Sequence, residues 1–207
     1  MERLNHESDV EKFLKSGNLT QPFLNIETLK EKINIDYLAK RNKGQSVTIL
    51  HCLISWIKHS IKTEREDKGF IRENKFQRTA KEIWESGKST GCTDYATVFC
   101  TLARQLGYSC TLLHTAEYKW LQKLKNGERL DYHSGHSFCE CYYNNHWVLV
   151  DPTCNEITEN YNPQKIELNY LVGDSSTFVP YFRELDLCQK QTLRQHNDIM
   201  DEMCKNL

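Results

Sequence analysis

The sequence predicts an α+β fold in which a buried helix packs against an antiparallel sheet. Apolar residues recur at helical spacing through the N-terminal part of the chain, and residues 108–150 contain runs of strand-forming residues. Between these two regions, an apolar stripe that begins at Cys92 indicates a buried helix. With 207 residues, the chain is long enough to enclose a substantial core.

Composition places the chain among globular proteins and argues against some partners. Hydrophobic residues make up 39% of the chain and charged residues 27%. Lys and Arg number 27 and Asp and Glu 28, so the formal net charge of −1 supplies no field that would attract nucleic acid or an anionic membrane. We therefore expect neither a nucleic-acid partner nor membrane association.

The nine cysteines are the unusual feature of the composition, because an odd number leaves at least one thiol without an intramolecular partner. The first residues, MERLNHESDVEKF, lack the apolar run of a secretory signal. The longest largely apolar stretch, residues 47–57, is far shorter than the ~20 residues that span a bilayer. We therefore expect a cytoplasmic protein whose cysteines remain reduced.

Residues 1–75 are predicted to form a helical extension packed on a core that spans residues 76–180. Apolar residues at helical spacing over 10–40, interrupted at Gly17 and Pro22, indicate two helices in this extension.

The next elements are predicted from apolar spacing and charge. A helix is expected over 46–61 with Ser46 as its N-cap, and the highly charged stretch 63–75 suits a solvated loop. A further helix is expected over 76–85. A glycine-rich connection then leads to the buried helix, which Gly107 ends.

The remaining elements alternate between strands and less regular segments. A strand is predicted over 108–113, and the polar excursion 116–135 is interpreted as an insertion or long loop that either borders a functional site or is simply solvated. Residues 155–180 are expected to be loop with one short strand over 166–171. Apolar spacing over 181–207 predicts a closing amphipathic helix.

Residues 137–143 and 146–150 are predicted to form a β-hairpin. The two residues between them, Asn144 and Asn145, suit a tight turn because asparagine tolerates positive φ.

Cys92 is the first candidate for chemistry because of its position. A thiol at a helix N-terminus faces unpaired amides and the positive end of the helix dipole, and both lower its pKa. The bland alternative is a cysteine that packs as a small hydrophobic residue, and Cys100 and Cys110 fit that description.

The second candidate is the pair His136 and Asp151, on opposite arms of the hairpin. With a two-residue loop, Asp151 pairs with Phe138 and His136 with Thr153, which leaves His136 and Asp151 one diagonal step apart on one face. A cysteine nucleophile needs a base within reach and a third group that orients the base. These three residues could fill the three roles.

Two segments carry a family resemblance. ESGKSTGCTDYATVFCTLARQLGYSCTL (85–112) resembles the nucleophile motif of the transglutaminase-like superfamily, a Gly-Cys followed by Asp-Tyr-Ala and a helix that ends in Leu-Gly. HSFCECYYNNHWVLVDPT (136–153) resembles its His-Ala-Trp-x-Glu-Val-Tyr and Trp-Val-x-Val-Asp-Pro-Thr strands.

The resemblance implies a papain-like core with Cys92 as nucleophile, His136 as general base and Asp151 as orienting carboxylate. The chain departs from the motif at Ser137 and Phe138, which replace Ala and Trp. His133 is a rival base, but it does not align with the motif.

An oxyanion hole needs hydrogen-bond donors. The backbone N–H of Cys92 is the first candidate. In animal transglutaminases an upstream tryptophan supplies the second, and either Trp56 or Trp84 could correspond to it. The alternative for both is a core aromatic residue.

A zinc site is the alternative from another class, because His133, His136, Cys139 and Cys141 are all potential ligands. On a strand, however, the two cysteines point to one face and His136 to the other. No stretch offers the closely spaced carboxylates of a calcium loop. We therefore expect no metal and no cofactor.

The resemblance predicts a cysteine enzyme that acts on amide bonds of a peptide or protein through a thioester. Water as acceptor makes it a peptidase or amidase, which is the preferred interpretation. An amine acceptor would make it a protein-glutamine transglutaminase. The third alternative is a catalytically silent binding module that kept the fold.

Overall fold

The computed structural model describes residues 8–44, 47–128, 134–171 and 174–186. Its main sheet has six strands, in the spatial order β6-β5-β4-β3-β8-β7, and every neighbouring pair is antiparallel. The strands are β3 (Cys110–Glu117), β4 (Gly135–Tyr143), β5 (His146–Asp151), β6 (Glu156–Thr158), β7 (Ile166–Leu171) and β8 (Asp174–Glu184).

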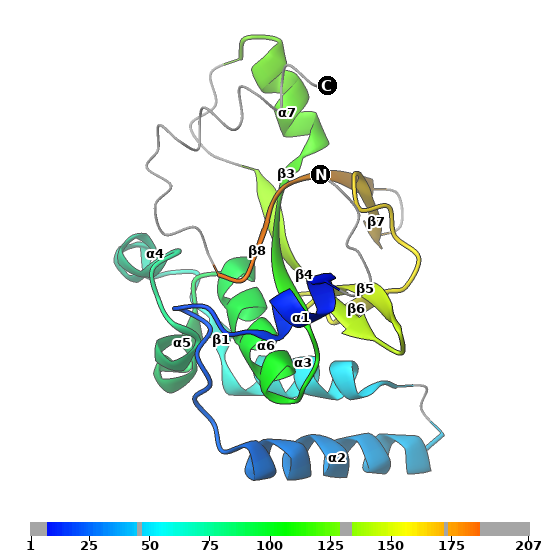
Figure 1. Ribbon diagram of the computed structural model, residues 1–207. Coiled ribbons are helices and arrows are strands. Elements are labelled where there is room, and N and C mark those ends of the chain that lie inside the picture. Colours follow the sequence, from blue (N-terminus) through cyan, green and yellow to red (C-terminus); the bar gives the residue numbers. More distant parts are fainter. Residues whose placement is uncertain (1–7, 45–46, 129–133, 172–173, 187–207) are drawn as a thin grey trace.

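Helices build up successive layers on one side of this sheet (Figure 1). The helices of this stack are α2 (Ile26–Asn42), α3 (Ile49–Ser60) and α6 (Cys92–Gln105). α6 packs against β3 and β4, α3 packs against α6, and α2 packs against α3. The short α1 (Ser8–Leu14) contacts β3. The arrangement confirms the predicted α+β fold with a buried helix on an antiparallel sheet.

The apolar residues that recur at helical spacing in the sequence are those buried between the layers. α3 and α6 each present fully buried apolar residues to the interior, and a smaller apolar cluster covers the other face of the sheet. That second cluster consists of Leu113, Phe138, Leu149, Ile166 and Phe178. Among the residues described, no helix combines the length and apolarity needed to cross a bilayer.

The predicted start of the helix over 46–61 is wrong by a few residues. α3 begins at Ile49, and its N-cap is Thr48, whose side chain accepts a hydrogen bond from the His51 N–H. The His51 ring in turn accepts from the Thr48 backbone, which completes a capping box. Ser46 lies outside the described residues.

The charged stretch 63–75 is more ordered than predicted. Strand β1 (Lys62–Thr63) pairs in parallel with β2 (Lys88–Ser89), and α4 (Lys68–Asn74) begins at an Asp67 N-cap.

The helix predicted over 76–85 also begins later than expected. Phe76 has a φ of 62°, which is incompatible with a helix. α5 (Ala80–Ser86) starts directly after its N-cap Thr79, whose side chain forms a capping box with Glu82 in the first turn.

The excursion 116–135 contains a helix, so its interpretation as a long solvated loop is wrong for the described part. α7 (Tyr118–Lys125) buries Trp120 and Leu121, which pack near Val179 and Tyr181 of β8. Residues 129–133 lie outside the described part of the chain.

The C-terminal region holds one predicted strand and one that was missed. β7 matches the strand predicted over 166–171, whereas β8 crosses a region expected to be loop. Pro180 lies within β8 opposite Thr115, beside a register shift at which β8 carries one extra residue relative to β3. Sheets tolerate proline at such irregularities. Residues 181–184 are therefore strand and not the start of the predicted helix; residues 187–207 lie outside the described part.

Candidate active site

Cys92 is the first residue of α6, as predicted. The preceding Gly91 has φ 140° and ψ −156°, a conformation that residues with a Cβ adopt only under strain. Cys92 is partly exposed, whereas the other thiols of the core are buried. Those buried thiols are Cys52, Cys100, Cys110, Cys139 and Cys141.

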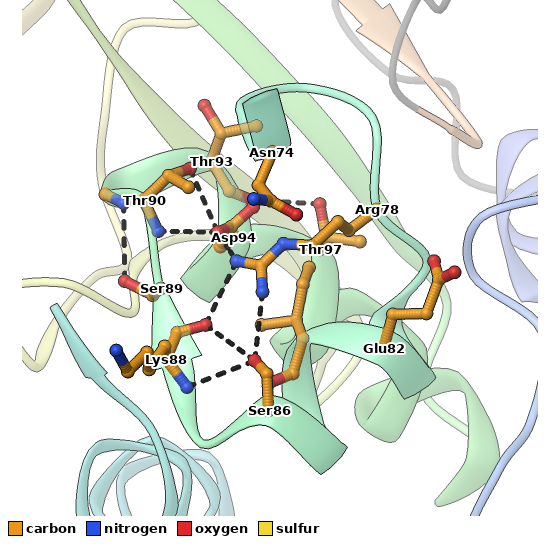
Figure 2. Close-up of polar contacts among 12 residues, drawn as sticks. Asn74, Arg78, Glu82, Ser86, Lys88, Ser89, Thr90, Thr93, Asp94 and Thr97 are labelled. Carbon is orange, nitrogen blue, oxygen red and sulfur yellow. Dashed lines mark hydrogen bonds and ion pairs between the residues drawn. The ribbon is translucent and has the colours of Figure 1, made fainter. Parts of the chain in front are cut away.

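A buried ion pair fixes the loop that leads into α6 (Figure 2). Asp94 Oδ2 lies 2.5 Å from an Arg78 guanidinium nitrogen, and it accepts hydrogen bonds from the Thr90 N–H at 2.6 Å and the Thr90 hydroxyl at 3.0 Å. Arg78 also donates to the Lys88 carbonyl at 3.0 Å. These bonds hold the first turn of α6 against the segment that precedes Cys92.

The sequence gives no local sign of this arrangement. Arg78 is one of many basic residues, and its partner Asp94 is 16 positions away. An acidic residue in the first turn of a buried helix is the only sequence signal that could have suggested a buried cation nearby.

His136 and Asp151 meet across the β4–β5 hairpin as predicted. The β4–β5 register pairs Tyr143 with His146 and continues to Cys139 with Val150, so one further step places Phe138 opposite Asp151. His136 Nε2 lies 2.8 Å from Asp151 Oδ2.

Asp151 is held from its other side as well. Its second oxygen, Oδ1, accepts hydrogen bonds from the backbone N–H groups of Thr153 at 2.9 Å and Cys154 at 3.1 Å. The Asp-Pro-Thr turn therefore fixes the carboxylate while leaving one oxygen directed at His136. The His136 ring also packs edge-on against Phe138, with 4.6 Å between centroids.

Cys92 and His136 interact as an acid–base pair. Burial alone would raise the pKa of the Cys92 thiol, but hydrogen bonding and charge interaction with His136, together with bonds to Ser137, lower it from 9.0 to about 7. Burial lowers the pKa of His136, but Asp151 and Cys92 outweigh it and raise the pKa to about 10. Because Nε2 faces Asp151, the ring's Nδ1 is the nitrogen left for Cys92. A thiolate–imidazolium pair is favoured near neutral pH.

The two tryptophans predicted as alternative oxyanion donors lie among aromatic rings. The centroids of Trp56 and Trp84 are 4.8 Å apart, and Trp84 also packs against Phe23 at 5.8 Å. Both rings pack on the main core. These contacts account for both side chains as packing residues, and a donor role for either stays a prediction.

The residues of the zinc alternative are separated by the sheet. Cys139 and Cys141 lie in the core beneath α6, whereas His136 bonds Asp151 and packs on Phe138 at the other face. Within the described ranges, no group of His, Cys, Asp or Glu side chains is arranged to hold a metal ion. His133 lies outside those ranges.

The chain is similar to known proteins both in sequence and in structure. A family model described as the transglutaminase-like superfamily matches residues 33–152. Among solved structures, the chain is similar to a candidate cysteine protease from Cytophaga hutchinsonii, with 17% sequence identity and a TM-score of 0.50. The similarity covers 89% of this chain and 50% of that protein, so this chain spans about half the length of the solved relative. No curated protein matches significantly.

The two matches bear on different predictions. The family match confirms the resemblance that the motifs suggested. Together with the family match, the structural likeness confirms the predicted papain-like, transglutaminase-like core; at 17% identity the likeness by itself shows the fold alone.

Proposed function

The chain belongs to the transglutaminase-like superfamily, and from this membership and the geometry around Cys92 we propose that it is a cysteine enzyme that cleaves amide bonds. Cys92 is the nucleophile, His136 the general base and acid, and Asp151 the residue that orients His136.

One observation carries this proposal. The partly exposed thiol of Cys92, at the start of a buried helix, is hydrogen-bonded to His136. His136 is in turn hydrogen-bonded to Asp151, whose carboxylate is held in place by backbone N–H groups. Nucleophilic catalysis needs this order of groups, because the base activates the thiol and the third group fixes the base.

The reaction follows from the roles of these groups. The Cys92 thiolate attacks the amide carbonyl carbon, the C–N bond breaks, and the leaving nitrogen takes a proton from the His136 imidazolium. Water then gives a proton to His136 and attacks the thioester, which releases a carboxylic acid and regenerates the Cys92 thiolate beside the His136 imidazolium. The N–H of Cys92, in the first turn of α6, is the expected oxyanion donor.

We favour water over an amine as the acceptor of the acyl group from the thioester, so the expected activity is that of a peptidase or amidase. The substrate is a peptide or protein, and the near-neutral net charge of −1 leaves its selection to local shape. Transfer to an amine, as in a protein-glutamine transglutaminase, is the alternative outcome.

Thiol labelling tests the nucleophile. We expect limiting iodoacetamide near neutral pH to modify Cys92 first, with the adduct located by mass spectrometry, and we expect His136→Ala to slow this reaction. Cys154, which is exposed, serves as the internal comparison. Equal labelling of the two cysteines, unaffected by His136→Ala, would overturn the proposal and favour a silent module.

Product analysis separates the two acceptors. The protein is incubated with a glutamine-bearing protein and a labelled primary amine, beside a Cys92→Ala control. Release of acid or ammonia without incorporation of the amine supports hydrolysis. Incorporation that depends on Cys92 would replace the hydrolase proposal with transamidation.

A further inference from the structure

Ser137 follows the base His136 and stands where the family motif has alanine. Its hydroxyl oxygen lies 2.9 Å from the Thr93 hydroxyl and 2.9 Å from Nδ1 of a second histidine, His114. Ser137 and His114 are direct cross-strand partners on β4 and β3, and both are buried. The serine therefore adds a polar link that alanine could not provide.

This link reaches the thiol of Cys92. Hydrogen bonding from the backbone N–H and the hydroxyl of Ser137 lowers the pKa of the Cys92 thiol, and Thr93 is the next residue of α6 after Cys92. Ser137 thus contacts the thiol, Thr93 and His114 together.

The His114 ring is held in place by its surroundings. Its side chain is surrounded by rings from two segments, with centroid separations of 5.4 Å to Phe182, 6.4 Å to Phe76 and 6.5 Å to Tyr181. His114 is 8% exposed. Close packing of this kind fixes the orientation of the ring, so that Nδ1 stays directed at Ser137.

The proton count decides what the link can do. A serine hydroxyl has one proton and two lone pairs. When His114 Nδ1–H and the Thr93 hydroxyl donate to Ser137 Oγ, the serine proton remains free to point at the sulfur. A hydrogen bond of this kind strengthens when its acceptor is charged, so it stabilises the thiolate more than the thiol.

We propose that His114 is a positioning residue that acts through the Ser137 hydroxyl to hold a hydrogen bond on the Cys92 thiolate. This inference rests on the proposed function, in which Cys92 is the nucleophile. No proton is transferred along the link, because the proton lost by Cys92 goes to His136.

Other charged groups near Cys92 set the background for a test. His136 faces the sulfur from β4, with Asp151 of β5 behind it. The Arg78–Asp94 pair lies on the other side of the first turn of α6, because residues two positions apart in a helix point in nearly opposite directions. None of these groups is altered by changes at Ser137 or His114.

The first experiment measures the alkylation rate of Cys92 against pH in Ser137→Ala. Alanine is the family residue at this position, so the variant is expected to fold. Losing one hydrogen bond to the thiolate should move the midpoint of the rate–pH curve up by about one pH unit. At pH values below that midpoint, alkylation should be roughly tenfold slower than in the unmodified protein. An unchanged midpoint would overturn the inference.

The second experiment uses two matched amides at His114. The amide nitrogen of asparagine falls near the position of Nδ1, and that of glutamine near Nε2. We expect His114→Asn to stay close to the unmodified protein and His114→Gln to show the Ser137→Ala behaviour. Equal rates for the two amides would mean that the Nδ1 donor has no role.

The combined variant tests whether His114 acts through Ser137. In a Ser137→Ala background, His114→Gln should cause no further slowing, because the link is already broken. An additional loss of the same size as in the single variant would overturn the inference. The proposed function fails separately, since it requires fast Cys92 labelling that depends on His136 whatever happens at Ser137.

Discussion

His136 Nε2 lies 2.8 Å from Asp151 Oδ2, although the two residues belong to different strands and are one diagonal step apart. The two-residue turn at Asn144 and Asn145, with φ of 49° and 65°, sets the parity that puts both side chains on one face. A register shift of one residue would send Asp151 to the opposite face of the sheet. The tight turn is therefore a condition for the candidate site.

Asp151→Asn should reduce activity with little loss of stability. The asparagine oxygen can still accept from the N–H groups of Thr153 and Cys154, but the amide presents no charge to His136. We expect kcat to fall about 10²- to 10⁴-fold, the range typical of a compromised general base. The measurement is amide hydrolysis alongside urea unfolding. Activity within a few-fold of the unmodified protein would show that Asp151 does not orient the base.

The rate of Cys92 alkylation should rise with pH around an unusually low midpoint for a thiol. The pKa of Cys92 is about 7 and that of His136 about 10, so the thiolate and the imidazolium coexist between these values. The iodoacetamide rate should rise as pH increases through about 7, where the thiol loses its proton.

An internal control is available for this measurement. Desolvation and the neighbouring Asp151 raise the pKa of Cys154 to about 11, so it should react appreciably only at much higher pH. Coincident pH profiles for the two cysteines would contradict the prediction.

Local features allowed much of the site to be predicted. The stripe that begins at Cys92 gave the start of α6, and the asparagine turn gave the hairpin register that joins His136 to Asp151. Both depend on neighbouring residues in the chain, where spacing alone carries the information.

Features that depend on distant packing were missed. Arg78 is recognisable only beside Asp94, and β8 only beside β3, where the sheet irregularity accommodates Pro180. α7 could have been found, because Trp120, Leu121 and Leu124 share one helical face, but its charged surroundings obscured that pattern.

Arg78→Met should be strongly destabilising. The side chains of Arg78 and Asp94 are 8% and 1% exposed, so removing the guanidinium leaves a buried carboxylate with only the Thr90 donors. Breaking a buried pair from one side costs about 3–5 kcal/mol. Urea unfolding measures this loss of unfolding free energy.

Lys81→Met is the matched control, because it breaks the Lys81–Glu85 pair, whose side chains are both 62% exposed. Its expected cost is below about 0.5 kcal/mol. Similar losses for Arg78→Met and Lys81→Met would count against a buried, energetically coupled Arg78.

Gly91→Ala should impair Cys92 specifically. A Cβ at this position meets no atom within 4 Å, so the cost comes from the φ of 140° and not from a clash. Relief of that strain, about 1–3 kcal/mol, would shift the backbone that presents Cys92. Gly44→Ala is the control, since its φ of 74° is also positive and its surroundings are equally open. We expect both variants to lose stability and only Gly91→Ala to slow alkylation; slowing by both would point to a global effect.

His51 makes the N-terminus of α3 sensitive to acid. Its Nδ1 accepts a hydrogen bond from the Thr48 N–H at 3.3 Å, which requires an unprotonated nitrogen. Burial lowers the pKa of His51 below 6.5, so the unfolded chain takes up the proton more readily than the folded one. The stabilisation is therefore complete above 6.5 and is lost as pH falls through the folded pKa.

His51→Gln isolates this contribution, because glutamine at the same capping-box position accepts the Thr48 N–H without titrating. Urea unfolding of both proteins at about pH 7.5 and about pH 5 should show the unmodified protein losing up to about 1 kcal/mol more than the variant in acid, the value of one helix cap. Subtracting the variant removes the contributions of all other titrating groups, since these are common to both proteins. The decisive quantity is the difference in unfolding free energy between the unmodified protein and His51→Gln. If this difference is the same at both pH values, or shifts in favour of the unmodified protein in acid, the neutral ring of His51 does not stabilise α3.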